Sequence, residues 1–89
     1  MPQENTIEAV RNRKTQKLFI VVDDTLDTRY KVINPSGEIL ILPDLLFEDD
    51  AIGVSSDRFD AEFTKEQLAA LNTYNEKAAE LARLEALRA

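Results

Sequence analysis

The spacing of apolar residues divides the chain into a polar start, a middle of short apolar runs and an end with helical periodicity. Residues 1–16 contain four apolar side chains apart from a proline, namely Met1, Ile7, Ala9 and Val10, and these are too few for an amphipathic face. A turn or two of helix without such a face is marginal in water. We therefore expect a flexible or weakly helical N-terminal tail over residues 1–16.

The middle of the chain predicts a strand followed by a β-hairpin. Residues 18–22 form an apolar run bounded by polar residues, which is typical of a strand covered on both faces. Residues 28–33 and 38–42 are β-branched and apolar runs on either side of the sequence Asn-Pro-Ser-Gly at 34–37. Asn, Pro and Gly at these positions suit a type I turn. We predict a hairpin over residues 28–42.

The remaining apolar residues predict two further strands and one long helix. Residues 51–55 and 58–63 have the length and composition of short strands. Thr64 and Gln67 fit a capping box, in which each side chain bonds the other residue's backbone N–H. Apolar residues then recur at three- and four-residue steps with no Gly or Pro between them. We predict a helix over residues 64–88, about 36 Å long.

Runs of strands followed by a helix are typical of the α+β class. We predict a small antiparallel sheet or open SH3-like barrel of about five short strands, followed by one long C-terminal helix. Its parts are the tail over residues 1–16 and a single α+β domain over residues 17–89. The strands of this domain lie within residues 17–63 and its helix covers residues 64–88.

The composition excludes several kinds of chemistry. The chain has no Cys and no His, so it has no disulfide, no thiolate metal site and no imidazole that titrates near neutral pH. Its acidic residues fall mainly in predicted turns, where water keeps carboxyl pKa values alike. General acid–base catalysis instead needs two carboxyl groups whose pKa values differ. We therefore expect no catalytic residues and a protein that is not an enzyme.

One acidic stretch, FIVVDDTLDT from Phe19 to Thr28, superficially resembles the first motif of haloacid-dehalogenase-like phosphatases. In that motif an apolar strand ends in Asp-x-Asp-x-Thr, and the first Asp is the nucleophile. Matching Asp23 and Thr25 to the second Asp and the Thr puts Val21 at the nucleophile position, and the other registers also fail. We interpret the stretch as a strand and its polar turn, with exposed aspartates and with Phe19 and Val21 on one buried face.

Acidic clusters at residues 23–27 and 48–50 are the candidate cation ligands, because hard cations bind carboxylates. Neither cluster has the Asp-x-Asp-x-Asp-Gly spacing of a dedicated cation-binding loop. We interpret both clusters as solvated charge, and we expect no metal and no cofactor.

Charge is unevenly distributed along the chain, whose net charge is −6. Residues 1–22 carry four basic and two acidic groups, whereas residues 23–66 carry four basic and twelve acidic groups. The acidic middle would repel nucleic-acid phosphates and anionic membranes over roughly 8–10 Å at physiological salt. We therefore favour a protein partner over nucleic acid.

The alternative function is a nucleic-acid-associated accessory domain that uses a basic arm over residues 11–17, since basic side chains can neutralise phosphates. This arm consists of Arg11, Arg13, Lys14 and Lys17. Residues 1–17 do not resemble a signal peptide, and no stretch of about 20 apolar residues occurs. We expect a cytoplasmic location and no membrane partner.

An exposed strand edge and two apolar segments are candidates for contacts with another protein. The first segment, LPDLLF, predicts a helical turn with Asp44 as its N-cap. The second is the far half of the C-terminal helix, because this helix is longer than a sheet of five-residue strands, each about 17 Å, can cover. The candidate residues are Leu45, Leu46, Phe47, Leu81, Leu84 and Leu87. We predict a small, acidic, non-catalytic protein–protein interaction module, with homodimerisation through the C-terminal helix as one form of this interaction.

Overall fold

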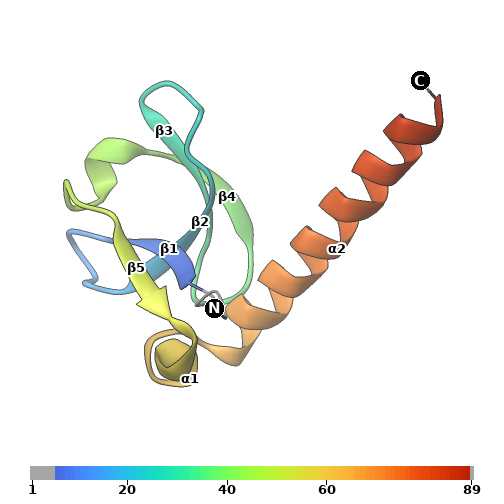
Figure 1. The fold of residues 1–89 in the computed structure, drawn as a ribbon. Helices are drawn as coiled ribbons and strands as arrows, with labels where there is room; N and C mark the ends of the chain where they lie inside the picture. Colours follow the sequence, from blue (N-terminus) through green and yellow to red (C-terminus); the bar gives the residue numbers. More distant parts are fainter. Residues whose placement is uncertain (1–5, 89) are drawn as a thin grey trace.

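The computed structural model describes residues 6–88, which form a five-stranded antiparallel sheet followed by a long helix (Figure 1). The strand order is β4-β3-β2-β1-β5, and the sheet is open and not a closed barrel. The predicted α+β class is confirmed. The elements are β1 (Thr6–Arg11), β2 (Leu18–Asp23), β3 (Arg29–Ile33), β4 (Ile39–Pro43), the 3-10 helix η1 (Asp44–Leu46), β5 (Ile52–Ser55), the 3-10 helix η2 (Ser56–Arg58), α1 (Phe59–Glu62) and α2 (Lys65–Arg88).

The first strand, β1, corrects the prediction of a flexible or weakly helical tail. The prediction is wrong for Thr6–Arg11, whereas residues 1–5 of the predicted tail lie outside the described residues. β1 pairs with β2 on one side and with β5 on the other, so its backbone hydrogen-bonding groups have partners at both edges. Its three apolar side chains are buried in both cores of the sheet, Ile7 and Ala9 on one face and Val10 on the other.

The segment after β5 corrects a second prediction. Residues 58–63 do not form a strand; they belong to η2 and α1, and Phe63 follows α1 as its C-cap. The backbone N–H of Phe63 bonds the Phe59 carbonyl, and the two aromatic rings lie 6.2 Å apart. This turn carries Phe63 into the core at the start of α2. The predicted number of strands is therefore confirmed, but β1 takes the place of residues 58–63.

Both faces of the sheet are covered by apolar side chains, because neighbouring residues of a strand point to opposite faces. On one face Ile7, Leu18, Ile20 and Ile33 pack with α1 and the start of α2. On the other face Val10 and Val32 pack around Phe47. The first cluster also contains Val54 and Phe63. Partly buried residues of β2, β3 and β4 pack against the second, among them Phe19, Tyr30, Leu40 and Leu42.

Strand β2 has the two covered faces that its apolar run predicts, although the faces differ in depth. Leu18 and Ile20 are buried beneath α2, and Phe19 and Val21 share the opposite face, where they are half-buried. The predicted common face of Phe19 and Val21 is therefore confirmed, but it is not the more deeply buried one.

The predicted hairpin over residues 28–42 is confirmed as β3 and β4. The N–H of Gly37 donates to the Asn34 carbonyl, and Gly37 has a positive φ of 88°. The chain then enters η1, whose N-cap is Pro43 with no side-chain hydrogen bond, so the prediction that Asp44 caps this turn is wrong.

Candidate interaction site

The first three turns of α2 are held to the sheet mainly by Gln67, a polar side chain that is only 1% exposed. Its amide nitrogen donates to the carbonyls of Leu18 (2.9 Å) and Ile33 (3.1 Å), which belong to β2 and β3. Its amide oxygen accepts the N–H of Thr64 (3.0 Å). The side chain thus joins the helix start to two strands with no buried polar atom left unpaired.

The predicted capping box is confirmed at the same place. The Thr64 hydroxyl oxygen accepts the Gln67 N–H at 3.1 Å, reciprocating the bond from Thr64 N–H to Gln67. The hydroxyl also donates to the Pro35 carbonyl in the β3–β4 turn. Within this turn, Gly37 lies directly against the backbone of Glu66. The β3–β4 turn therefore clamps the start of α2.

Tyr74 is the last partly buried residue of α2 before the exposed residues 75–87. Leu68 and Leu71 pack onto the core, and the Lys31 ammonium lies 5.3 Å from the centre of the Tyr74 ring. From Asn75 to Leu87 every residue of the helix is exposed. In Figure 1 this part of α2 leaves the sheet and runs away from it. We name residues 65–74 the inner half of α2 and residues 75–87 the outer half.

The outer half carries the three predicted interaction residues of the helix, and all are well exposed. Leu81 is 58% exposed, Leu84 is 47% and Leu87 is 77%. They recur at three-residue steps, so they form one broad stripe rather than surrounding the helix. Four neighbouring positions, 78, 79, 82 and 86, carry Ala. These small side chains allow the backbone of another helix to approach closely.

The LPDLLF segment is only partly available for contacts. Leu45 is 81% exposed and Leu46 is 43% exposed, as an interaction surface requires. Phe47, however, is buried, and its ring meets those of Phe19 and Tyr30 edge-on at 5.3 and 6.0 Å. Phe47 is thus a core residue, and its prediction as an interaction residue is wrong.

The basic arm is the end of the β1–β2 hairpin rather than a free tail. Two of its members have partners within the molecule: Arg13 forms a 2.9 Å ion pair with Asp49, and Arg11 donates to the Gln16 carbonyl at 2.9 Å. Lys14 and Lys17 are exposed on the same turn. The four basic side chains are thus close in the fold, but two of them are used to fasten the hairpin.

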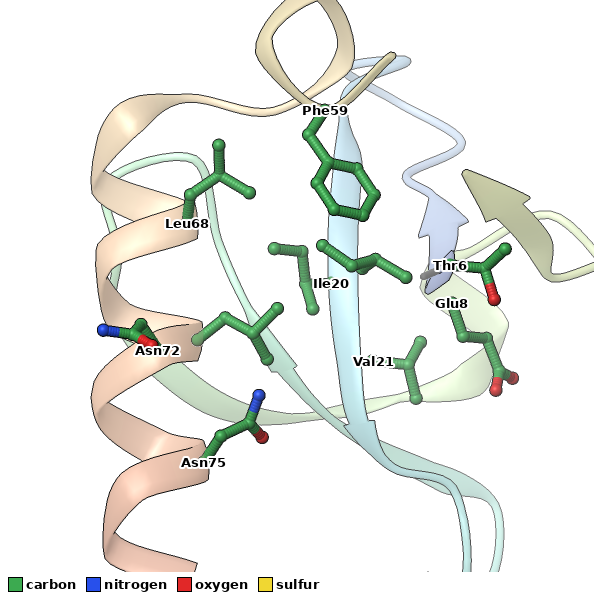
Figure 2. Close-up of a pocket in the computed structure, with 10 residues that line it drawn as sticks. Thr6, Glu8, Ile20, Val21, Phe59, Leu68, Asn72 and Asn75 are labelled. Atoms are coloured by element: carbon green, nitrogen blue, oxygen red, sulfur yellow. The ribbon is translucent and has the colours of Figure 1, made fainter. Parts of the chain in front are cut away.

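A groove of about 680 Å³ lies between α2 and strands β1 and β2. Figure 2 shows Leu68, Asn72 and Asn75 of α2 on one side and Thr6 and Glu8 of β1 on the other. Among its lining residues Glu8 is the only titratable side chain. A single exposed carboxylate cannot form an acid–base pair, so the lining offers none.

Among the acidic residues of the 23–27 turn, Asp24 and Asp27 are exposed and Asp23 is half-buried. The Thr25 hydroxyl donates to the Asp23 carboxylate at 2.6 Å, and the Thr25 N–H donates at 2.8 Å. These bonds, together with the charge of Lys31, hold the pKa of Asp23 below its ordinary value. Within residues 6–88 no three acidic side chains converge as a metal site would require.

Comparisons with protein-family models, with curated proteins and with solved structures give no match to this chain. In the part of the chain that the structure describes, no helix has the length and apolar character needed to cross a membrane. The interpretation of the surfaces therefore depends on their geometry.

Two exposed isoleucines and one buried glutamine have roles that sequence reasoning missed. Ile39 and Ile41 of β4 are 43% and 53% exposed, and neither was among the predicted interaction residues. Gln67 was assigned to the capping box alone. Its distance in sequence from Leu18 and Ile33 gave no sign that it bonds them.

Proposed function

We propose that this protein is a small, non-catalytic protein–protein interaction module that binds its partner through the outer half of α2. The observation that carries the proposal is the exposure of Leu81, Leu84 and Leu87 on a helix that has left its own sheet. Full burial of a Leu side chain contributes about 1.5–3 kcal/mol. Since these three side chains are between 47% and 77% exposed, a partner that covers them would gain about 3–5 kcal/mol from them.

The outer half is suited to be a preformed binding element. Ala, Leu, Glu, Lys and Arg, which are strong helix formers, make up all but one of its residues. The inner half, clamped through Gln67, supplies the nucleus from which the helix continues. A helix that is already formed loses little conformational entropy when it binds.

The test is capture of binding partners from an extract of the native host, quantified by mass spectrometry. The variant carries Leu81→Ser, Leu84→Ser and Leu87→Ser. The matched control carries Glu76→Ser, Glu80→Ser and Glu85→Ser, which change the same helix half to the same residue but leave the leucines. We expect the amount of partner captured by the leucine variant to fall at least about tenfold, as a loss of 1.4 kcal/mol in binding free energy would produce. The control should capture as much partner as the parent chain.

Equal capture by the two variants and the parent chain would contradict the proposal. Far-UV circular dichroism of all three chains checks that the helix is retained, because Ser lowers helix propensity equally in both variants. A folded leucine variant that still captures the same partners would show that the outer half is not the binding element.

The alternative, a nucleic-acid-associated accessory domain, draws support from the gathering of Arg11, Arg13, Lys14 and Lys17 at one end of the β1–β2 hairpin. Electrostatic binding of this kind weakens steeply as salt rises. The measurement is the shift of a labelled duplex at low and at physiological salt. Absence of any shift at low salt would end this alternative, and a salt-dependent shift lost on Lys14→Glu and Lys17→Glu would favour it.

Homodimerisation through the outer halves of α2 alone would be a small interface. Thirteen residues span about 20 Å, and a strip about 10 Å wide presents on the order of 200 Å². Stable interfaces bury about 800 Å² on each partner. A second copy would therefore need a further surface besides α2.

A further inference from the structure

The large apolar side chains that are exposed within residues 6–88 lie in only two segments of the chain. Three are the leucines of the α2 outer half, and the other four are Ile39, Ile41, Leu45 and Leu46, in β4 and η1. β4 is an edge strand, hydrogen-bonded to β3 alone. The opposite edge, β5, exposes no large apolar residue. The two edge strands thus differ. Of the two, β4 alone has both a backbone edge that no other strand bonds and large apolar side chains that are exposed.

The pairing of β4 with β3 determines which backbone N–H and C=O groups of β4 point away from the sheet. The Asp44 N–H donates to the Thr28 carbonyl, and the Glu38 carbonyl accepts the Asn34 N–H, so even-numbered residues of this strand face β3. In an antiparallel strand the N–H and C=O of one residue point to the same side, and the side alternates along the chain. The N–H and C=O of both Ile39 and Ile41 therefore point away from the sheet.

We propose that the partner of this interaction module is a second copy of the chain, which pairs its β4 antiparallel with this β4 across a twofold axis at Leu40. In this register Ile39 lies opposite Ile41 of the second copy, and Ile41 lies opposite Ile39. Each of these pairs exchanges both N–H···O bonds, so all outward groups of the two isoleucines in both copies are bonded. The result is one continuous sheet of ten strands.

The sequence of the strand fits a twofold axis. Ile39-Leu40-Ile41 reads the same in both directions, so the pairing places isoleucine against isoleucine on one face and Leu40 against Leu40 on the other. Pro43, which has no N–H, comes after the last bonded pair and removes no bond from the new ladder. No like charges face each other, because Glu38 falls opposite Leu42 of the second copy.

The stripe of leucines on α2 lies on the same side of the molecule as the exposed face of β4. Ile39 and Ile41 are opposite Ile33 and Lys31 of β3, whose side chains face α2. Glu66 faces the β3–β4 turn through its contact with Gly37. Leu84 follows Glu66 by five full turns of 3.6 residues, so it lies on the same flank of the helix.

A second copy docked on the β4 edge is therefore placed to contact the outer half of α2 as well, and this supplies the additional area that α2 alone lacks. The inference rests on the proposed function, because it names the partner of the same apolar surface. The inference also predicts that the outward backbone groups of β4 become hydrogen-bonded, which the proposed function does not. The inference and the proposed function can therefore be tested separately.

The first measurement is hydrogen exchange of the full chain by NMR, together with sedimentation equilibrium, over roughly a hundredfold range of concentration. The amides of Leu40 and Leu42 bond β3 and should be protected at every concentration. The amides of Ile39 and Ile41 should exchange rapidly in dilute solution and slow down as the dimer forms. Rapid exchange of both at a concentration where the chain is dimeric would overturn β4 pairing.

The second measurement is sedimentation equilibrium of Ile41→Lys, with Ala51→Lys as the matched control. A lysine on the edge strand opposes pairing because its charge would lie in the apolar face of the new sheet, whereas Ala51 is exposed next to β5, at the opposite edge of the sheet. We expect Ile41→Lys to raise the dimer dissociation constant at least about tenfold, a change of 1.4 kcal/mol, and the control to leave it nearly unchanged. A chain that is monomeric throughout the range overturns the inference.

The two proposals fail in different ways. A dimer that survives Ile41→Lys but is lost on Leu81→Ser, Leu84→Ser and Leu87→Ser would overturn β4 pairing and leave the proposed function intact. A dimer that is lost on Ile41→Lys but indifferent to the leucine substitutions would support β4 pairing and contradict the role of the outer half.

Discussion

The inner and outer halves of α2 belong to one continuous helix, yet they have opposite environments. The inner half, residues 65–74, carries a buried amide, a capping box and leucines in the core. The outer half, residues 75–87, is exposed at every position. Both halves contain leucine and alanine at helical spacing, so composition does not distinguish them. The difference arises from a few polar and backbone contacts at the helix start, which position the inner half and leave the outer half free for other contacts.

Replacing Gln67 with Leu should give the largest effect, because it removes the amide that joins α2 to β2 and β3. The Leu18 and Ile33 carbonyls and the Thr64 N–H would lose their partner in a buried site. Each unsatisfied buried group costs about 1–3 kcal/mol. Since some of these groups will find water, we expect the free energy of unfolding to fall by about 2–4 kcal/mol in urea denaturation.

The control for this substitution is Asn72→Ala on the same helix, where the side chain bonds only the exposed Glu76. It should change the free energy of unfolding by less than about 0.5 kcal/mol. Similar stability losses for the two variants would mean that Gln67 does not hold the inner half in place.

Replacing Gly37 with Ala tests the clamp from the other side, the β3–β4 turn. Gly37 has a φ of 88°, and an added Cβ would lie 2.8 Å from the Glu66 carbonyl oxygen. The left-handed backbone alone costs an L-residue about 1–2 kcal/mol, and the close contact adds to it. We expect a loss of about 2 kcal/mol in thermal or urea unfolding.

Gly53→Ala is the matched control, because no atom lies within 4 Å of its added Cβ and its φ is not in the positive region. This substitution should leave stability unchanged or raise it by up to about 1 kcal/mol, since Ala restricts the unfolded chain. Equal losses at Gly37 and Gly53 would argue against a clamp at the turn.

Truncating one leucine in each half compares the halves directly. Leu71 packs on the core and is half-buried, whereas Leu84 is exposed. Leu71→Ala should therefore cost about 1–2 kcal/mol, at or below the lower end of the range for buried leucines. Leu84→Ala should change monomer stability by less than about 0.5 kcal/mol. Urea denaturation in dilute solution measures both, and a larger cost at Leu84 would mean that the outer half packs on its own domain.

Several elements could be predicted because their signals are local. The structure contains the apolar run of β2, the turn at Asn34 and Gly37, and the capping box of Thr64 and Gln67. In each of these three features, the residues that give the signal are only a few positions apart in the sequence. Local signals of this kind depend on backbone preference and side-chain bonding that the neighbouring sequence determines.

The elements that could not be predicted depend on partners far away in the chain. β1 is a strand because β2 and β5 bond it on both sides, and β5 begins more than 40 residues later. Phe47 is buried because the β1–β2 hairpin and β3 bring Phe19 and Tyr30 to it. An all-apolar strand such as β4 gave no indication that it would lie at an edge. Burial at these sites is a property of the assembled sheet.

The smallest effect is expected at the turn that follows β2. Replacing Asp23, Asp24 and Asp27 with Asn removes three charges from the turn between β2 and β3. At neutral pH we expect the melting temperature to change little, because Asp24 and Asp27 are exposed. Only Asp23 has defined partners, the hydroxyl and N–H of Thr25.

The contribution of Asp23 can be recognised from its pH dependence. Because the Thr25 bonds lower the pKa of Asp23 below its ordinary value of 3.8, the folded state binds the proton less readily than the unfolded state. Its stabilising effect is therefore complete above the unfolded pKa and is lost as pH falls through the folded pKa. Asp23→Asn should flatten the stability profile below about pH 4. Identical acid profiles for Asp23→Asn and the parent chain, measured by urea denaturation at a series of pH values, would show that the Thr25 bonds do not form in solution.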